Sequence, residues 1–170
     1  LTTYLASDVA YHLEKAGRLA TPDEQKILAK YVGWGGIDKA VDAWRGGQME
    51  MPASEKDDTQ VKWEKFWGPL HKELSGMLTP EEMDAARTSI LNAHYTSQDV
   101  ISGIWKALDH LGFKGGKALE PSAGIGNFIG LVPESARENT SWMGVELDRT
   151  TAGILKHLYQ DAQIFNAGFQ

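Results

Sequence analysis

The sequence predicts an α/β fold, in which a helical N-terminal region is followed by about three parallel strands. Short apolar runs at residues 117–120, 142–146 and 163–165 predict the strands. A helical pattern follows each of the first two runs, and strands that alternate with helices pair in parallel through right-handed crossovers. These crossovers predict a sheet with the strand order 3-2-1.

Apolar spacing and capping residues predict the helices that come before the strands. Residues 4–16 place apolar side chains on one helical face. Thr21 supplies an N-cap and is followed by a proline and two acids, so a second helix begins there and continues to about residue 31. A Gly-Trp-Gly-Gly turn at residues 33–36 ends this helix.

The middle of the chain predicts more helices and one loop. A polar stretch at residues 46–58, rich in Gly, Pro, Ser and charge, is typical of a mobile loop. Four further helices are expected, at about residues 37–44, 61–74, 80–91 and 98–111. The second of these is rich enough in apolar residues to be well buried. We divide the chain into a helical lead-in, residues 1–78, and an α/β part, residues 79–170.

Two glycines and one acid predict a site for a nucleotide-shaped ligand. Gly124 and Gly126 follow the first strand, and without a Cβ the backbone can turn sharply there and approach a ligand. Glu146 ends the second strand at close to the usual interval of about 20 residues, where its carboxylate can accept hydrogen bonds from both hydroxyls of a ribose. An ordinary strand-to-helix turn and a solvated strand end are the simpler interpretations of the same residues.

The turn favours S-adenosylmethionine over a dinucleotide as the ligand. A dinucleotide turn carries a third glycine, and Ile129 stands at that position here. Glu120 lies just before the turn, where a carboxylate would repel a pyrophosphate and would attract a sulfonium or ammonium group.

Three segments resemble motifs of adenine-N6 DNA methyltransferases. Residues 120–128, Glu-Pro-Ser-Ala-Gly-Ile-Gly-Asn-Phe, resemble the first motif, and residues 144–148, Gly-Val-Glu-Leu-Asp, resemble the second. Residues 92–97, Asn-Ala-His-Tyr-Thr-Ser, resemble the segment that precedes the first motif in circularly ordered members. More narrowly, the chain is similar to the methyltransferase region of large methylase-helicase proteins of phages and conjugative elements, sometimes linked to antirestriction, in which a Gly-Trp-Gly-Gly turn commonly precedes the methylase motifs.

The resemblance implies a Rossmann-like class I methyltransferase sheet, of which this chain holds the first half. Tyr95 and Thr96 would then hold the methionine end of the cofactor, with Glu120 near its amino group. Glu146 would bind the ribose, and Leu147 would lie against the adenine. The other residues of this expected site, which form the turn under the ligand or pack behind it, are Pro121, Ser122, Ala123, Gly124, Gly126 and Phe128.

Two departures from the family concern the methyl acceptor. The catalytic Asn/Asp-Pro-Pro-Tyr/Phe tetrapeptide occurs nowhere in the sequence, so we expect no catalytic residue and no activity of this chain alone. Gly168 stands where an Asp often contacts the adenine amino group, which leaves Asn166, Gln170 or the backbone for that contact. A complete domain of this kind needs about seven strands and this chain has room for about three, so we interpret it as a fragment of a longer protein.

Composition narrows the classes of protein that fit. With 42% hydrophobic residues and six Trp, the chain has enough apolar material for a core. It contains no Cys, which removes disulfides and thiolate metal sites and is compatible with a reducing cytoplasm. No apolar run approaches the roughly 20 residues that span a membrane, and no second ligand lies at metal-binding spacing from His94.

The net charge of −6 argues against strong DNA binding by this piece alone, because DNA affinity rests largely on Lys and Arg. We expect the parent protein to bind DNA through other regions, including a helicase region in the same polypeptide, and to transfer a methyl group from S-adenosylmethionine to adenine. Two alternatives stay open: a non-catalytic scaffold or binding module attached to a helicase, and a methyltransferase with RNA, protein or a small molecule as acceptor.

Overall fold

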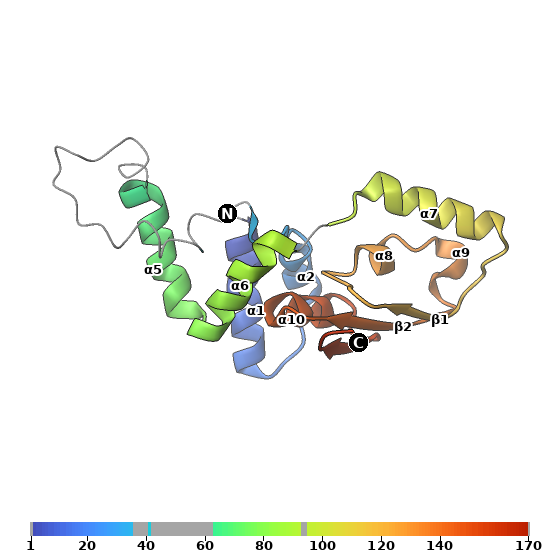
Figure 1. The fold of residues 1–170 in the computed structure, drawn as a ribbon. Helices are drawn as coiled ribbons and strands as arrows, with labels where there is room; N and C mark the ends of the chain where they lie inside the picture. The colour runs from blue at the N-terminus through green and yellow to red at the C-terminus, as the bar shows by residue number, and fades with distance from the viewer. Residues whose placement is uncertain (1, 36–40, 42–62, 93–94, 170) are drawn as a thin grey trace. The chain divides into compact units, whose positions relative to one another are not determined.

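A computed structural model describes residues 2–35, 41, 63–92 and 95–169 (Figure 1). The chain forms two compact units: one joins Leu1–Tyr31 to Ala93–Gln170, and the other is Val32–Asn92. The helix expected at residues 37–44, apart from Val41, and the loop expected at residues 46–58 lie outside the described residues. The residues of the expected lead-in are therefore shared between the two units.

A three-stranded parallel sheet forms the centre of the first unit. Its strands are β1 (Gly116–Glu120), β2 (Thr140–Glu146) and β3 (Gln163–Asn166), and β2 pairs with both of the others. Each of the three predicted strands is found, with small differences at the ends. The α/β class expected from the sequence is confirmed. Because the strands are parallel, the carboxyl ends of β1 and β2 lie at the same edge of the sheet, where the predicted site residues cluster.

Helices are found before β1 and after β1 and β2, as expected, although two short helices take the place of one after β1. These helices are α7 (Gln98–His110), α8 (Asn127–Gly130), α9 (Glu134–Arg137) and α10 (Arg149–Leu158). Ser97 occupies the N-cap position of α7, although its side chain makes no capping hydrogen bond. Trp142 of β2 packs against two apolar clusters, one formed by Ile101, Trp105, Val132 and Ala136 and the other by Ala123, Ile129 and Leu155.

The opposite face of the sheet carries exposed apolar side chains. Successive strand residues alternate between faces, so Leu119 and its partner Met143 point away from the face of Trp142. Their side chains are 49% and 38% exposed, and Phe165 on the same face is 48% exposed. Helices of the described part therefore cover one face of this sheet more fully than the other.

The first unit also contains two N-terminal helices, α1 (Thr2–Ala16) and α2 (Pro22–Leu28). The predicted N-cap at Thr21 is confirmed, and Glu24 completes a capping box with it. Both helices contact α10. The Gln25 amide nitrogen donates to the carbonyl oxygens of His157 at 2.9 Å and Leu158 at 3.2 Å. These bonds satisfy carbonyl groups at the end of α10 that no later turn of helix can reach.

The second unit contains a π-helix, η3 (Trp63–Trp67), followed by α5 (Gly68–Met77) and α6 (Pro80–Asn92). The burial expected for this region is found only in part, because Leu74 is buried and Phe66 is 71% exposed. Thr79 and Glu82 form the expected capped start of α6, with reciprocal hydrogen bonds of 2.9 and 3.2 Å. No helix within the described ranges of either unit is long and apolar enough to cross a membrane.

The turn between β1 and α8 requires glycine at two positions. Gly124 has a φ of 55° and Gly126 a φ of 80°, in the left-handed region that other residues avoid. A Cβ on Gly126 would lie 2.5 Å from Cε2 of Tyr159 and 2.7 Å from Cδ1 of Leu155. Gly126 is therefore required for the packing of this turn against α10 and the residue that follows it.

Replacement of Gly126 by Ala should lower the free energy of unfolding by about 2–4 kcal/mol, because it adds a left-handed strain and an overpacked methyl group. The control is Gly103→Ala in the exposed face of α7, where a Cβ meets nothing within 4 Å. That change should raise the stability by about 0.5–1 kcal/mol. Urea unfolding followed by circular dichroism measures both, and equal stabilities of the two variants would contradict the assignment.

Candidate functional site

The turn after β1 and the end of β2 are joined by backbone and side-chain hydrogen bonds. The Ala123 nitrogen donates to the Val145 carbonyl at 2.9 Å, and the Gly124 nitrogen donates to Oε2 of Glu146 at 2.8 Å. The structure thus brings together the two features that the sequence singled out, a glycine turn and an acid that lies 22 residues further along the chain.

The Glu146 carboxylate is the centre of this arrangement. Its second oxygen, Oε1, accepts a hydrogen bond of 2.8 Å from the Asp148 nitrogen. Two ionised carboxylate oxygens offer about four acceptor positions, so two positions remain after the bonds from Gly124 and Asp148. The geometry therefore fixes the carboxylate in place and leaves it able to accept two more donors, as the hydroxyl pair of a ribose would supply.

Asp148 and Thr151 continue the site onto α10. Asp148 is the N-cap of this helix, and its Oδ1 accepts bonds from the Thr151 nitrogen at 2.7 Å and the Thr151 hydroxyl at 2.5 Å. The Thr151 hydroxyl lies 3.3 Å from the hydroxyl of Tyr31. Sequence reasoning assigned no role at the site to Tyr31 or Thr151, because 120 residues separate them along the chain.

Tyr95 lies against the glycine turn. A Cβ on Gly124 would be 3.3 Å from Cε1 of the Tyr95 ring, so a glycine is needed there for a close approach as well as for the backbone angle. Burial, followed by the charges of Glu146 and Asp148, raises the pKa of Tyr95 to about 12. The phenol therefore keeps its proton at neutral pH and is available as a hydrogen-bond donor. Thr96, the next residue, is exposed.

Glu120 is a carboxyl group in an unusual environment. Burial, and then the charge of Glu146, raise its pKa to about 7. Its Oε2 atom is buried and has no hydrogen-bond partner within the described residues. Burial and then Glu120 also raise the pKa of Tyr159. An acid that is half-buried, close to another acid and lacking a partner is better stabilised by an added cation or donor than by its present surroundings.

The other predicted site residues divide by exposure. Ala123 is buried, and Phe128 packs against the cluster of Ile101 and Trp105 behind the turn. Leu147 is 74% exposed. Pro121 and Ser122 are exposed residues of the turn. Phe128 therefore packs in an apolar cluster, whereas Leu147 is exposed directly after the end of β2.

Asn166 is less suited to reading an adenine than the sequence indicated. Its amide nitrogen donates to the carbonyl oxygens of Glu146 at 3.0 Å and Leu147 at 2.9 Å. Both amide protons are then used in holding β3 to the end of β2, which leaves Oδ1 as an acceptor. Gln170, the other candidate, lies outside the described residues.

The local charge of the site is negative, because Glu146 lies close to Glu120 and contacts a second acid, Asp148. This pattern suits an ammonium or sulfonium ligand and opposes a pyrophosphate. No group of three or more His, Cys, Asp or Glu that could hold a metal ion occurs in the described part of the chain.

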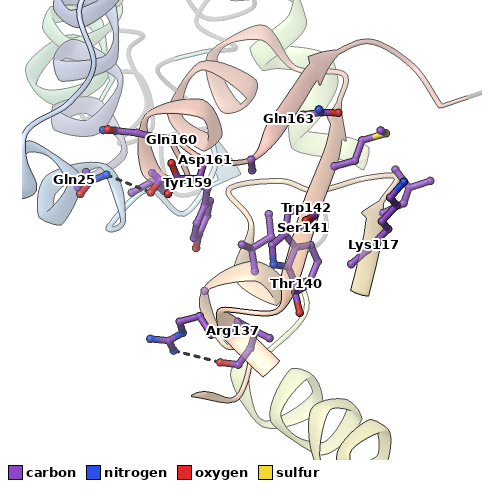
Figure 2. Close-up of a pocket in the computed structure, with 18 residues that line it drawn as sticks. Gln25, Lys117, Arg137, Thr140, Ser141, Trp142, Tyr159, Gln160, Asp161 and Gln163 are labelled. Carbon is purple, nitrogen blue, oxygen red and sulfur yellow. Dashed lines mark hydrogen bonds between the residues drawn. The ribbon is translucent and has the colours of Figure 1, made fainter. Parts of the chain in front are cut away.

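A hollow of about 1000 Å³ lies elsewhere in the first unit (Figure 2). Its lining includes Lys117 and Trp142 from the sheet and Arg137, Tyr159 and Gln160 from the segments beside it. None of the predicted cofactor-binding residues lines it. Ligands of open parallel sheets bind at the carboxyl ends of the strands, so we place the functional site at the glycine turn and not in this hollow.

Replacement of Glu120 by Gln should change how stability depends on pH. The folded-state pKa of about 7 is above the ordinary value of 4.5, so the contribution of the protonated acid is complete below pH 4.5 and is lost as the pH rises through 7. Gln is neutral throughout. The variant should match the wild type at pH 4 and exceed its stability by about 1–2 kcal/mol at pH 8, after discounting for partial exposure. Urea unfolding measures the free energy of unfolding of both proteins. A difference between the variant and the wild type that is the same at pH 4 and pH 8 would contradict this assignment.

Comparison with known proteins leaves the site to be interpreted from its own chemistry. No family model, no curated protein and no solved structure matches the chain.

Proposed function

We propose that this chain is the cofactor-binding part of an S-adenosylmethionine-dependent DNA methyltransferase of the adenine-N6 type. One observation carries the proposal: the Glu146 carboxylate, at the end of β2, holds the Gly124 nitrogen of the turn after β1 at 2.8 Å. This contact creates, at the carboxyl edge of a parallel sheet, the pair of features that an adenosyl ligand needs. The parallel pairing of β1, β2 and β3 supports the finer proposal of a Rossmann-like sheet.

The residues present have a chemistry that fits S-adenosylmethionine. The partnerless buried oxygen of Glu120 would accept from the ammonium group of the methionine end, and that contact would lower the pKa of Glu120. The two free acceptor positions of Glu146 would receive the ribose hydroxyls. Tyr95, which keeps its proton, would donate from the side of Gly124, and the exposed Leu147 would offer an apolar surface to the adenine.

When bound, the cofactor supplies an electrophilic methyl group on a sulfonium. The residues described here bind and orient this donor, and such positioning accounts for much of the rate in group transfer. The base that accepts the methyl group would be turned out of the duplex by other parts of the parent protein. We place this activity in the cytoplasm. Because this chain carries a net charge of −6, DNA would be bound mainly through other regions of the parent protein, including its helicase region.

A second candidate function is a non-catalytic module that keeps the fold. The observation that favours it is that both oxygens of Glu146 already accept backbone hydrogen bonds, from Gly124 and Asp148. Under this alternative the acid only fastens the turn to the sheet. A methyltransferase that acts on RNA, protein or a small molecule would use the same donor site and is separated from the DNA enzyme by its acceptor.

Titration calorimetry with S-adenosylhomocysteine distinguishes the two candidates. A cofactor-binding domain should give a saturable isotherm with one site per chain. A folded sample that releases no heat, and whose melting temperature is unchanged by the nucleoside, would favour the non-catalytic module. Incubating the parent protein with labelled S-adenosylmethionine and either DNA or RNA identifies the acceptor.

Replacement of Glu146 by Ala should weaken binding of S-adenosylhomocysteine about tenfold to a hundredfold, since charge-assisted hydrogen bonds contribute about 1.5–3 kcal/mol. The matched control is Glu73→Ala, which removes one acidic charge from an exposed position of α5. Calorimetry measures the affinity and circular dichroism checks the fold. If the Glu146 variant is folded and binds as tightly as the control, Glu146 does not contact the cofactor.

A further inference from the structure

Tyr31 links the N-terminal helices to the candidate site. It follows α2, its side chain is 2% exposed, and its hydroxyl lies 3.3 Å from the hydroxyl of Thr151 on α10. Burial raises its pKa most, followed by the charges of Tyr95, Asp148 and Glu146. A residue outside the methyltransferase-like motifs therefore lies among the groups that form the site.

The hydrogen bonds around Thr151 assign a direction to this contact. A threonine hydroxyl has one proton, and the Thr151 oxygen lies 2.5 Å from Oδ1 of Asp148, a carboxylate that accepts. Oδ1 of Asp148 and the Tyr31 hydroxyl both lie within reach of that proton, so Thr151 is the donor that the two contacts share. At 3.3 Å the bond to Tyr31 is longer than most hydroxyl hydrogen bonds, so its loss should have a modest effect.

Thr151 is also connected to the glycine turn. Its partner Asp148 donates its backbone N–H to Oε1 of Glu146 at 2.8 Å, and the other oxygen of Glu146 accepts from the Gly124 nitrogen at 2.8 Å. One hydroxyl, that of Thr151, therefore connects Tyr31 through Asp148 and Glu146 to the Gly124 nitrogen.

The segment that carries Tyr31 is held to α10 at a second place. The Gln160 amide nitrogen donates to the Ala20 carbonyl at 2.8 Å, and the Gln25 amide nitrogen donates to two carbonyls at the end of α10. These bonds lie at the C-terminal end of the helix, whereas Thr151 lies in its first turn. Contacts at both ends of α10 restrict how Tyr31 can move relative to Thr151.

We propose that Tyr31 is a positioning residue of the cofactor site, which acts through Thr151 and Asp148 to hold the Glu146 carboxylate against the Gly124 nitrogen. The N-terminal helices are then part of the donor site and set its affinity for the adenosyl ligand. This inference rests on the proposed function for its binding consequence, while the link between Tyr31 and Gly124 also exists in the protein without ligand.

Tyr31→Phe removes the hydroxyl and keeps the buried ring. We expect it to weaken binding of S-adenosylhomocysteine about threefold to tenfold, the loss that corresponds to one ordinary hydrogen bond. Tyr11→Phe is the matched control, because Tyr11 is a partly exposed residue of α1 outside the site. The second readout is the Gly124 amide signal in a nitrogen-15 spectrum of the ligand-free protein, which should shift in Tyr31→Phe and stay unchanged in Tyr11→Phe.

A double-mutant cycle with Thr151→Val separates positioning from general packing. If Tyr31 acts through the Thr151 hydroxyl, Tyr31→Phe should have almost no further effect on either readout once that hydroxyl is gone. An undiminished effect in the Thr151→Val background would overturn the proposal, and so would an unchanged Gly124 signal in Tyr31→Phe. If the wild type binds no S-adenosylhomocysteine, the proposed function fails, and the Gly124 signal alone decides whether Tyr31 positions the site.

Discussion

The contact on which the site depends is the hydrogen bond from the Gly124 nitrogen to the Glu146 carboxylate, 2.8 Å long. A turn that contains two left-handed glycines has little stability of its own, because glycine loses more conformational entropy on folding than other residues. Glu146 offsets part of this loss by accepting from the turn with one oxygen and from Asp148 with the other. A change at Glu146 therefore affects the shape of the turn as well as any ligand contact, which is why binding and folding have to be measured on the same variant.

The acids at this edge of the sheet place a second constraint on the site. Glu120 has its pKa raised to about 7 by burial and by Glu146, and its buried Oε2 has no partner in the described residues. Such an arrangement costs free energy unless a cation or a donor completes it. Structural carboxylates usually find partners within their own protein. The raised pKa and the unpartnered oxygen of Glu120 are thus easier to explain in a binding site than in a non-catalytic module in which Glu146 only holds the turn to the sheet.

Local patterns were sufficient to predict the strands, the capped helices and the placement of Glu146 beside the glycine turn, because each depends on residues near in sequence or on the standard connection between parallel strands. The direct bond between Gly124 and Glu146 required the structure. The sequence predicts only part of the role of Gly126. Its backbone angle follows from the turn, but its conflict with Tyr159 and Leu155 depends on how α10 packs. The two amide bonds of Asn166 also required the structure, since nothing in the sequence shows that both protons are directed at backbone carbonyls.

Tyr31 illustrates why the rest of the site could not be found from sequence. A motif records residues that lie close together along the chain, whereas the contact between Tyr31 and Thr151 forms only when the N-terminal helices pack on α10. The expected boundary at residue 78 separated the lead-in from the site for the same reason. In the structure, residues 1–31 belong to the same compact unit as the sheet. The proposed cofactor site would therefore be assembled from distant parts of the chain, and under the proposal the stability of the N-terminal helices would affect the affinity for the ligand.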